Sequence, residues 1–227
     1  MTIKNSILSW LVSILVPLAL IGLAIRVLLS PVFYKVEYSM PYFPPDDYGF
    51  TKDDRLKLAP YAVNYLVNNA DISYIGDLKF EDGKPLYNER ELSHMKDVKR
   101  VTQGALRVWY LSLALLAALG AWAWFGGWWD GYRAGLMRGG WLMVGLAVTI
   151  GIIVVVGIVV DPNVFDRFFV AFHGLFFEGD TWLFLFSDTL IRLFPIRFWQ
   201  DAFLWAAAIA LGGGVALGLG LRSANLR

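Results

Sequence analysis

The feature that most constrains this chain is Trp141–Val160, a run of twenty residues without a charged side chain. A helix of this length spans about 30 Å, which is the thickness of the hydrocarbon core of a bilayer. Such a run is typical of a membrane-crossing helix rather than of the core of a soluble domain. The whole chain agrees, because 57% of its 227 residues are hydrophobic and only 17% are charged. The sequence therefore predicts an integral membrane protein.

Three further apolar runs are long enough to cross a bilayer. We expect the first span within residues 1–29, where Ile7–Leu29 is almost entirely apolar. A cleavable signal peptide is the alternative, but this run is longer than a typical signal core. Residues 105–160 are expected to hold the second and third spans with a loop between them, and residues 201–227 the fourth span and a tail. The predicted fold class is an all-α polytopic membrane protein with four transmembrane helices.

The charges in the short connecting segments predict the orientation, because basic residues concentrate on the cytoplasmic side of a membrane. On one side only Asp130 opposes a set of basic residues: Lys4, Arg133, Arg138, Arg222 and Arg227. Both termini and the loop between the second and third spans are then expected to be cytoplasmic. Segments 30–104 and 161–200 are expected outside, where together they would form a small extracytoplasmic cap.

Several chemistries are excluded by what the chain lacks. It has no cysteine, so disulfides and thiolate nucleophiles are absent. Two histidines with scattered carboxylates match no metal-ligand spacing, so we predict no metal site. The sequence contains neither a Gly-x-Ser-x-Gly elbow nor a glycine-rich phosphate loop. A net charge of +1 gives no indication of a nucleic-acid partner.

The first outward segment contains clear local signals. Tyr38–Asp47 is rich in proline and tyrosine, which excludes a regular helix and favours an extended arm. Thr51 and Asp54 are spaced like a capping box, so we expect a helix to follow them. Asn88 and Glu91 have the same spacing and predict a second helix that begins near residue 89 and continues into the second span.

Each outward segment holds one of the two histidines, His94 and His173. A neutral imidazole is a natural base or proton shuttle near neutral pH, and a carboxylate such as Glu91, Asp97 or Asp180 could set its tautomer. The alternative is that each ring is simply a packed, hydrogen-bonded residue. His173 lies in a phenylalanine-rich stretch with helical spacing, which favours a location at the membrane interface.

Two stretches of the chain resemble the bacterial lipoprotein intramolecular transacylase family, Lit. They are NERELSHMKDV at residues 88–98 and FHGLFFEGDTW at residues 172–182, the second followed by DTLIRLFPIRFW at residues 188–199. Elsewhere the resemblance is architectural, and residues 55–84 contain no motif of the family. The resemblance implies an enzyme of the bacterial cell membrane whose catalytic residues are His94 and His173.

The resemblance also implies the reaction and its partners. The sn-2 acyl chain of a diacylated lipoprotein would move from the glyceryl oxygen to the amino group of the lipidated N-terminal cysteine, giving the lyso-form. Besides this lipoprotein, membrane lipid is an expected partner. Conversion of an ester to an amide is downhill, so no cofactor is expected.

Attack of the amine on the ester carbonyl closes a ring of about eight atoms, which is entropically unfavourable. The enzyme must therefore hold a flexible substrate in a near-attack geometry, and a confined aromatic pocket would do so. Residues predicted to contact the substrate are Arg90, Glu91, Asp97, Phe172, Phe176, Phe177, Asp180 and Trp182. Core packing is the alternative role for these aromatic side chains.

A different class of function stays open from the sequence. A non-catalytic membrane scaffold or sensor could bind a partner through its outer cap, with the arm at Tyr38–Asp47 as the contact surface. A transporter fits less well, because the four predicted spans carry almost no ionisable residues in their interiors.

Overall fold

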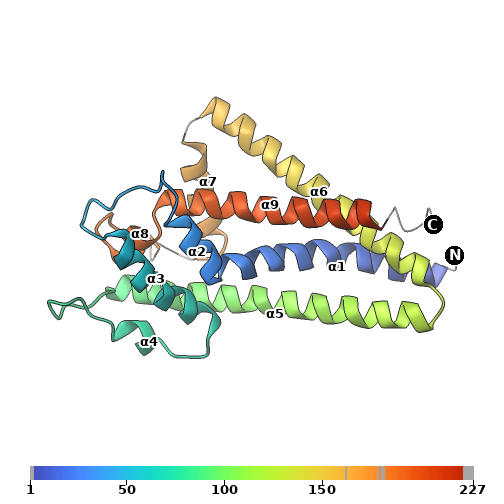
Figure 1. Ribbon diagram of the computed structural model, residues 1–227, viewed down its shortest axis with the longest axis horizontal. Coiled ribbons are helices and arrows are strands. Elements are labelled where there is room, and N and C mark those ends of the chain that lie inside the picture. The colour runs from blue at the N-terminus through green and yellow to red at the C-terminus, as the bar shows by residue number, and fades with distance from the viewer. Residues whose placement is uncertain (1–2, 162, 178, 180–181, 222–227) are drawn as a thin grey trace. The chain divides into compact units, whose positions relative to one another are not determined.

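The computed structural model describes residues 3–161, 163–177, 179 and 182–221. Within these residues the regular secondary structure is helical, and an isolated bridge between Lys79 and Pro85 is the only β pairing. Figure 1 shows the order of the helices along the chain. The chain divides into a bundle unit, Met1–Arg26, Ala105–Val159 and Leu204–Arg227, and a histidine unit, Val27–Gly104 and Val160–Phe203.

Four helices are long and apolar enough to cross a membrane: α1 (Ile3–Leu28), α5 (Glu89–Phe125), α6 (Trp129–Val160) and α9 (Ile196–Gly220). They confirm the four predicted spans, and the fold class is all-α as expected. Two helices begin earlier than the sequence predicted. The helix α6 starts at Trp129 rather than near Trp141, and α9 starts at Ile196 rather than near residue 201, because charged side chains do not interrupt a helix.

Close backbone contact holds α6 and α9 together within the bundle unit. A Cβ atom added to Gly140 would lie 2.6 Å from the carbonyl oxygen of Gly214, and one added to Gly214 would lie 2.8 Å from that of Gly140. At Gly218 an added Cβ would meet the Trp141 ring at 2.7 Å. Gly214 and Gly218 thus form a small-xxx-small pair whose missing side chains let α6 and α9 pack closely.

Helix α1 packs against α6 through hydroxyl groups as well as apolar side chains. Ser9 Oγ donates to the carbonyl oxygen of Gly131 at 2.5 Å, and Ser13 Oγ donates to that of Gly135 at 3.1 Å. Tyr132 on α6 donates to the carbonyl oxygen of Leu116 on α5 at 3.0 Å. Each of these buried hydroxyls has a backbone acceptor, as a dry interior requires.

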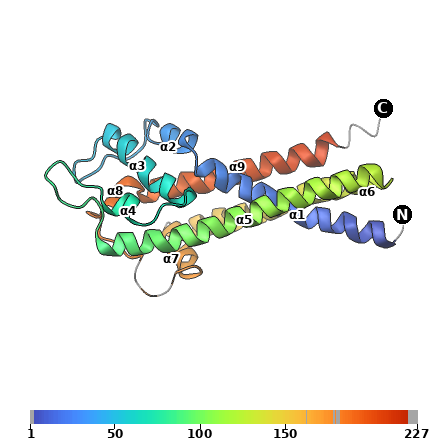
Figure 2. The same cartoon turned by 90° about the horizontal axis from the view of Figure 1, so that it is seen from below.

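One end of the bundle unit gathers the start of α1, the end of α9 and the connection between α5 and α6 (Figures 1 and 2). Basic side chains contact aromatic rings and backbone carbonyls there. The ammonium of Lys4 lies 5.1 Å from the Trp122 ring centroid, and Arg133 Nη2 donates to the carbonyl oxygen of Leu221 at 2.8 Å.

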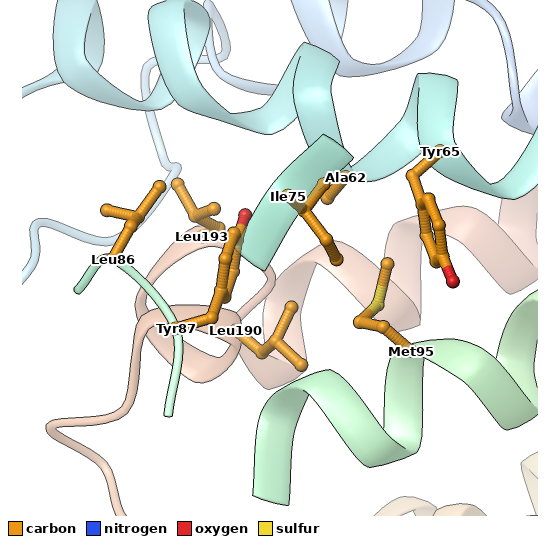
Figure 3. Close-up of a cluster of buried hydrophobic side chains, with 8 residues drawn as sticks. All are labelled: Ala62, Tyr65, Ile75, Leu86, Tyr87, Met95, Leu190 and Leu193. Carbon is orange, nitrogen blue, oxygen red and sulfur yellow. The ribbon is translucent and has the colours of Figure 1, made fainter. Parts of the chain in front are cut away.

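The histidine unit combines shorter helices with the first parts of α5 and α9. The shorter helices are α2 (Pro31–Glu37), α3 (Lys52–Val67), α4 (Ser73–Gly76), α7 (Val164–Gly174) and α8 (Thr189–Leu193). The predicted capping box at the start of α3 is present, with Thr51 and Asp54 each accepting from the other's backbone amide. Figure 3 shows the core of this unit, in which side chains from α3, α4, α5, α8 and the segment before α5 converge: Ala62, Tyr65, Ile75, Leu86, Tyr87, Met95, Leu190 and Leu193.

The proline- and tyrosine-rich stretch after α2 contains turns and irregular backbone, so the predicted absence of helix is confirmed. It packs against the unit rather than projecting from it. Arg55 donates to the carbonyl oxygen of Pro44 at 2.7 Å, and Arg192 forms an ion pair with Asp46 at 3.0 Å. The guanidinium of Arg197 lies 4.5 Å from the Tyr42 ring centroid. Three arginines thus hold this stretch against the rest of the histidine unit along its length.

Candidate active site

The first turn of α5 positions His94. As predicted, Asn88 and Glu91 form a reciprocal capping box, with the Asn88 amide donating to Glu91 Oε2 at 2.8 Å and the Glu91 amide donating to Asn88 Oδ1 at 3.0 Å. The second carboxylate oxygen of Glu91 accepts from the backbone amide of Leu190 at 2.7 Å. Glu91 therefore joins α5 to α8 and fixes the helix one turn before His94.

Helix α7 carries His173 in its last turn, and a phenylalanine face holds the helix in place. Phe203 at the start of α9 makes edge contacts with Phe165, Phe168 and Phe172, with centroid separations of 5.2–5.9 Å. Trp199 lies 5.7 Å from Phe169. These contacts seat α7 against α9, and the helical spacing of the phenylalanines follows from this packing.

The two imidazoles meet. Their ring centroids are 6.1 Å apart and the ring planes are inclined by 24°, so the rings are stacked. Both are buried, with 7% of His94 and 9% of His173 exposed. The predicted proximity of these side chains, which come from different segments of the chain, is therefore present in the structure.

Aromatic side chains enclose the pair. Phe177 touches both rings, with its centroid 4.8 Å from His94 and 5.7 Å from His173. Trp182 lies 5.2 Å from His173 and Phe172 lies 6.0 Å from it. Phe176, also predicted to line the pocket, packs behind Phe172 at 5.1 Å and is half-exposed.

Two members of the enclosure were not among the predicted residues. Phe169 lies 4.1 Å from His173 and Phe184 lies 5.3 Å from His94. Helical spacing could have indicated Phe169, because it precedes His173 by four residues. Phe184 stands outside any regular element, so no periodic signal pointed to it.

Burial makes both imidazoles neutral near pH 7. It lowers the pKa of His94 to about 4, with a further contribution from His173 and an opposing one from Asp97. Burial also lowers the pKa of His173, partly offset by its hydrogen bond to Phe169. The rings are therefore available as neutral bases or hydrogen-bonding groups rather than as cations.

The tautomer of His173 follows from one contact. Its Nδ1 lies 2.8 Å from the carbonyl oxygen of Phe169, and a carbonyl can only accept. Nδ1 therefore carries the hydrogen, and in the neutral ring Nε2 holds the free lone pair. His94 differs, because its Nδ1 is buried and has no hydrogen-bond partner among the described residues.

The charged residues predicted at the site have partners of their own. Asp97 forms an exposed ion pair with Arg100 at 3.0 Å, and Arg90 donates to the carbonyl oxygen of Leu183 at 3.1 Å. Glu91 is 1% exposed, and burial raises its pKa to about 7 while its bonds to backbone amides lower it. Asp180 lies outside the described residues.

The described ranges contain no group of three histidine or carboxylate side chains able to hold an ion. The site consists instead of two neutral imidazoles in an aromatic enclosure. This arrangement can move a proton in a space from which water is largely excluded.

Comparison with known proteins identifies the family of the chain. The model of the family described as lipoprotein intramolecular transacylase Lit matches residues 10–199. The chain belongs to the Lit family. It is accordingly a membrane acyltransferase that acts as a lipoprotein intramolecular transacylase, as the motifs around the two histidines implied.

Solved structures of Lit have the same fold. The in meso structure of membrane-integral Lit from Bacillus cereus superposes with a TM-score of 0.75 at 21% identity, covering 97% of this chain and 95% of the other. A B. cereus Lit structure with a histidine-to-arginine mutation gives a TM-score of 0.66 at 19% identity, covering 97% and 91%. An uncharacterized protein of Aquifex aeolicus (strain VF5) is 29% identical over 211 residues, covering 93% of this chain and 91% of its own length. The protein is therefore a multi-pass membrane protein.

Proposed function

We propose that this Lit protein transfers the sn-2 acyl chain of a diacylated lipoprotein from the glyceryl oxygen to the amino group of the lipidated N-terminal cysteine, giving the lyso-form. The observation that carries the proposal is the stacking of His94 and His173 at 6.1 Å inside a ring of aromatic side chains. Two imidazoles in a dry enclosure can supply the proton transfer that this reaction needs.

Substrate positioning is the larger part of the task. The amine must fold back onto the ester through a ring of about eight atoms, and holding such a conformer can lower the barrier by several kcal/mol. Phe172, Phe177 and Trp182 border the imidazoles and would confine the glyceryl group. The same enclosure keeps water from competing with the amine for the ester carbonyl.

We assign the base role to His173. Its Nδ1–H is held by the Phe169 carbonyl, so the lone pair on Nε2 is free to take a proton. The amine nitrogen forms a bond to the ester carbonyl carbon while Nε2 removes one of its hydrogens. The bond from carbon to the glyceryl oxygen then breaks, and the imidazolium of His173 returns the proton to that oxygen. Atoms and charges balance without a covalent acyl-enzyme.

His94 makes the second proposed contact with the reacting amine, after that of His173. Its buried Nδ1 has no hydrogen-bond partner in the described part of the chain, and a pKa of about 4 keeps the ring neutral at physiological pH. As an acceptor, Nδ1 takes a hydrogen bond from the amine hydrogen that remains in the amide product. This bond would orient the nitrogen lone pair toward the carbonyl carbon.

The proposed topology has both termini in the cytoplasm and the histidine unit on the outer side of the bacterial cell membrane. Basic residues in the short segments support this orientation, including Lys4, Arg133 and Arg138. The partners are then the lipidated N-terminus of a lipoprotein and the surrounding lipid.

The decisive experiment uses a synthetic diacylated lipopeptide incubated with the purified protein in lipid bicelles. We expect fragmentation mass spectrometry to show one acyl chain on the amine at unchanged total mass. A lipopeptide whose amine is acetylated beforehand is the control, because it has no nucleophile. Acyl chains that remain on glycerol in the unblocked peptide, or that are released as free acid, would contradict the proposal.

A further inference from the structure

Trp182 has an unusual indole nitrogen. Its Nε1 is buried and has no hydrogen-bond partner among the described residues. An unpaired buried donor costs about 1–3 kcal/mol, so native proteins usually satisfy such groups. Trp109 and Trp128 share this property, but both lie in the bundle unit. Trp182 differs from them because its ring lies 5.2 Å from the imidazole of His173.

We propose that Trp182 Nε1–H is the oxyanion donor of the acyl-transfer site. It would donate a hydrogen bond to the carbonyl oxygen of the sn-2 ester as negative charge develops on that oxygen. This role rests on the proposed function, and it makes Trp182 a catalytic residue rather than only a wall of the pocket. The ester carbonyl oxygen of the substrate would then be the hydrogen-bond acceptor that Trp182 Nε1 lacks among the described residues.

The position of Trp182 beside the base supports this role. During attack the amine nitrogen and the carbonyl oxygen are bound to the same carbon atom. The group that removes the proton and the group that binds the oxygen must therefore both reach one tetrahedral centre. His173 and Trp182 are neighbours inclined by 33°, so one centre can lie within hydrogen-bonding distance of both rings.

Other donors near the site are less suitable. The guanidinium of Arg90 already donates to the carbonyl oxygen of Leu183 and is exposed. The hydroxyl of Tyr87 is unpaired but lies in the apolar core of the histidine unit, with Leu86 and Leu190. An indole N–H is also a donor only, so it cannot compete with His173 for the proton of the amine.

Burial of the nitrogen strengthens the interaction that we propose. A fixed donor in a dry, low-dielectric site needs no reorganisation when charge develops, and one such donor contributes about 10²–10³ in rate. Trp182 Nε1 is buried, and so are both imidazoles. A substrate can therefore reach His173 only by displacing aromatic side chains, and Trp182 is one of the side chains in contact with His173.

The test compares Trp182→Phe with Trp128→Phe. Both substitutions remove a buried, unpaired indole N–H, but only the first is beside an imidazole. With the diacylated lipopeptide, we expect Trp182→Phe to lower kcat by about 10²–10³ with KM changed less than about threefold. Trp128→Phe should leave both constants near those of the wild type. A kcat of Trp182→Phe within threefold of Trp128→Phe would overturn the proposal.

A second variant separates the N–H from the shape of the ring. Benzothienylalanine at position 182, introduced by genetic code expansion, replaces the N–H by sulfur and preserves the bicyclic ring. We expect the same loss of kcat as in Trp182→Phe, and recovery of wild-type activity would refute the donor role. This variant also decides the question if the phenylalanine variant does not fold. If the wild type forms no amide product the proposed function fails, whereas full activity in both variants refutes only the role of Trp182.

Discussion

The bundle unit and the histidine unit treat buried polar groups differently. In the bundle unit the hydroxyls of Ser9, Ser13 and Tyr132 each donate to a backbone carbonyl. In the histidine unit His94 Nδ1 and the Tyr87 hydroxyl are buried and have no hydrogen-bond partner within the described ranges. Burial without a partner costs stability, and such groups are concentrated at functional sites. Unpaired buried groups also occur in the bundle unit, at the indole nitrogens of Trp109 and Trp128, so their number does not distinguish the two units. The difference lies in their position, because His94 Nδ1 and Trp182 Nε1 belong to rings that lie beside His173.

Three buried ionisable side chains of the histidine unit have shifted pKa values. In the histidine unit burial raises the pKa of Glu91 to about 7 and that of Glu37 to about 8, and it lowers the pKa of His94 to about 4. All three side chains are less than one-tenth exposed. Each of these three shifts favours the neutral form, whereas the largely buried side chains of Arg192 and Asp46 in the same unit form an ion pair.

The largest expected effect is on catalysis. His173→Ala should lower the rate of acyl transfer by about 10³, because it removes the base, and His94→Ala should also reduce it strongly. Both changes also remove buried aromatic packing, and His173→Ala removes the donor to the Phe169 carbonyl, so the rates should be compared on folded protein. Ser9→Ala in the bundle unit is the control and should lower stability with the rate unchanged. Wild-type rates in both histidine variants would show that neither imidazole is needed for acyl transfer.

A packing change in the bundle unit should come next. Gly140→Ala places a Cβ 2.6 Å from the Gly214 carbonyl oxygen and should cost about 3 kcal/mol, measured by unfolding in mixed micelles. Gly145→Ala is the matched control, since nothing lies within 4 Å of its added Cβ. Equal stability of the two variants would show that the contact between α6 and α9 contributes little.

Loss of the Glu91 carboxylate should have a moderate effect. Glu91→Ala leaves the backbone amides of Asn88 and Leu190 without an acceptor and should cost about 2 kcal/mol. The rate of acyl transfer should fall as well, because the start of α5 orients His94. Exposed Glu89→Ala, two residues earlier on the same helix, should change neither quantity. A stable, fully active Glu91→Ala variant would show that the joint between α5 and α8 is dispensable.

The smallest effect concerns pH and stability. Burial raises the pKa of Glu37, the negative charge of Asp201 raises it further, and Arg197 opposes them. Between about pH 4.5 and 8 the folded state therefore binds a proton that the unfolded state has lost, and stability falls as pH rises through this window. From pH 7 to 8 the loss should be about 1 kcal/mol, and Glu37→Gln should remove it. An unchanged pH slope in this variant would show that the Glu37 carboxyl is ionised in the folded protein.

His94 should produce the opposite slope at lower pH. Its folded pKa of about 4 lies below the ordinary value of 6.5, so the unfolded chain binds the additional proton between these values. The stability due to the buried neutral ring is complete above about pH 6.5 and is lost as pH falls toward 4. His94→Ala should flatten this acid limb without affecting the alkaline limb that Glu37 produces.

Much of the local structure followed from residues close together in the chain. The capping boxes at Thr51 and Asn88 begin α3 and α5 where their spacing predicts, because a cap is decided within four residues. The arm at residues 38–47 shows what local residues did not predict. Its prolines exclude helix, but its attachment by Arg55, Arg192 and Arg197 depends on residues far along the chain.

Contiguous residues determined the number of spans, the starts of α3 and α5 and the membrane environment, because apolar length and capping are local properties. Packing between distant segments determined that His94 and His173 stack, that Phe169 sets the tautomer of His173, and that the indole nitrogen of Trp182 has no acceptor among the described residues. These features depend on distances between side chains from separate helices and loops. Such distances arise when α7 packs against α9 and α5 is joined to α8, and no local pattern encodes them.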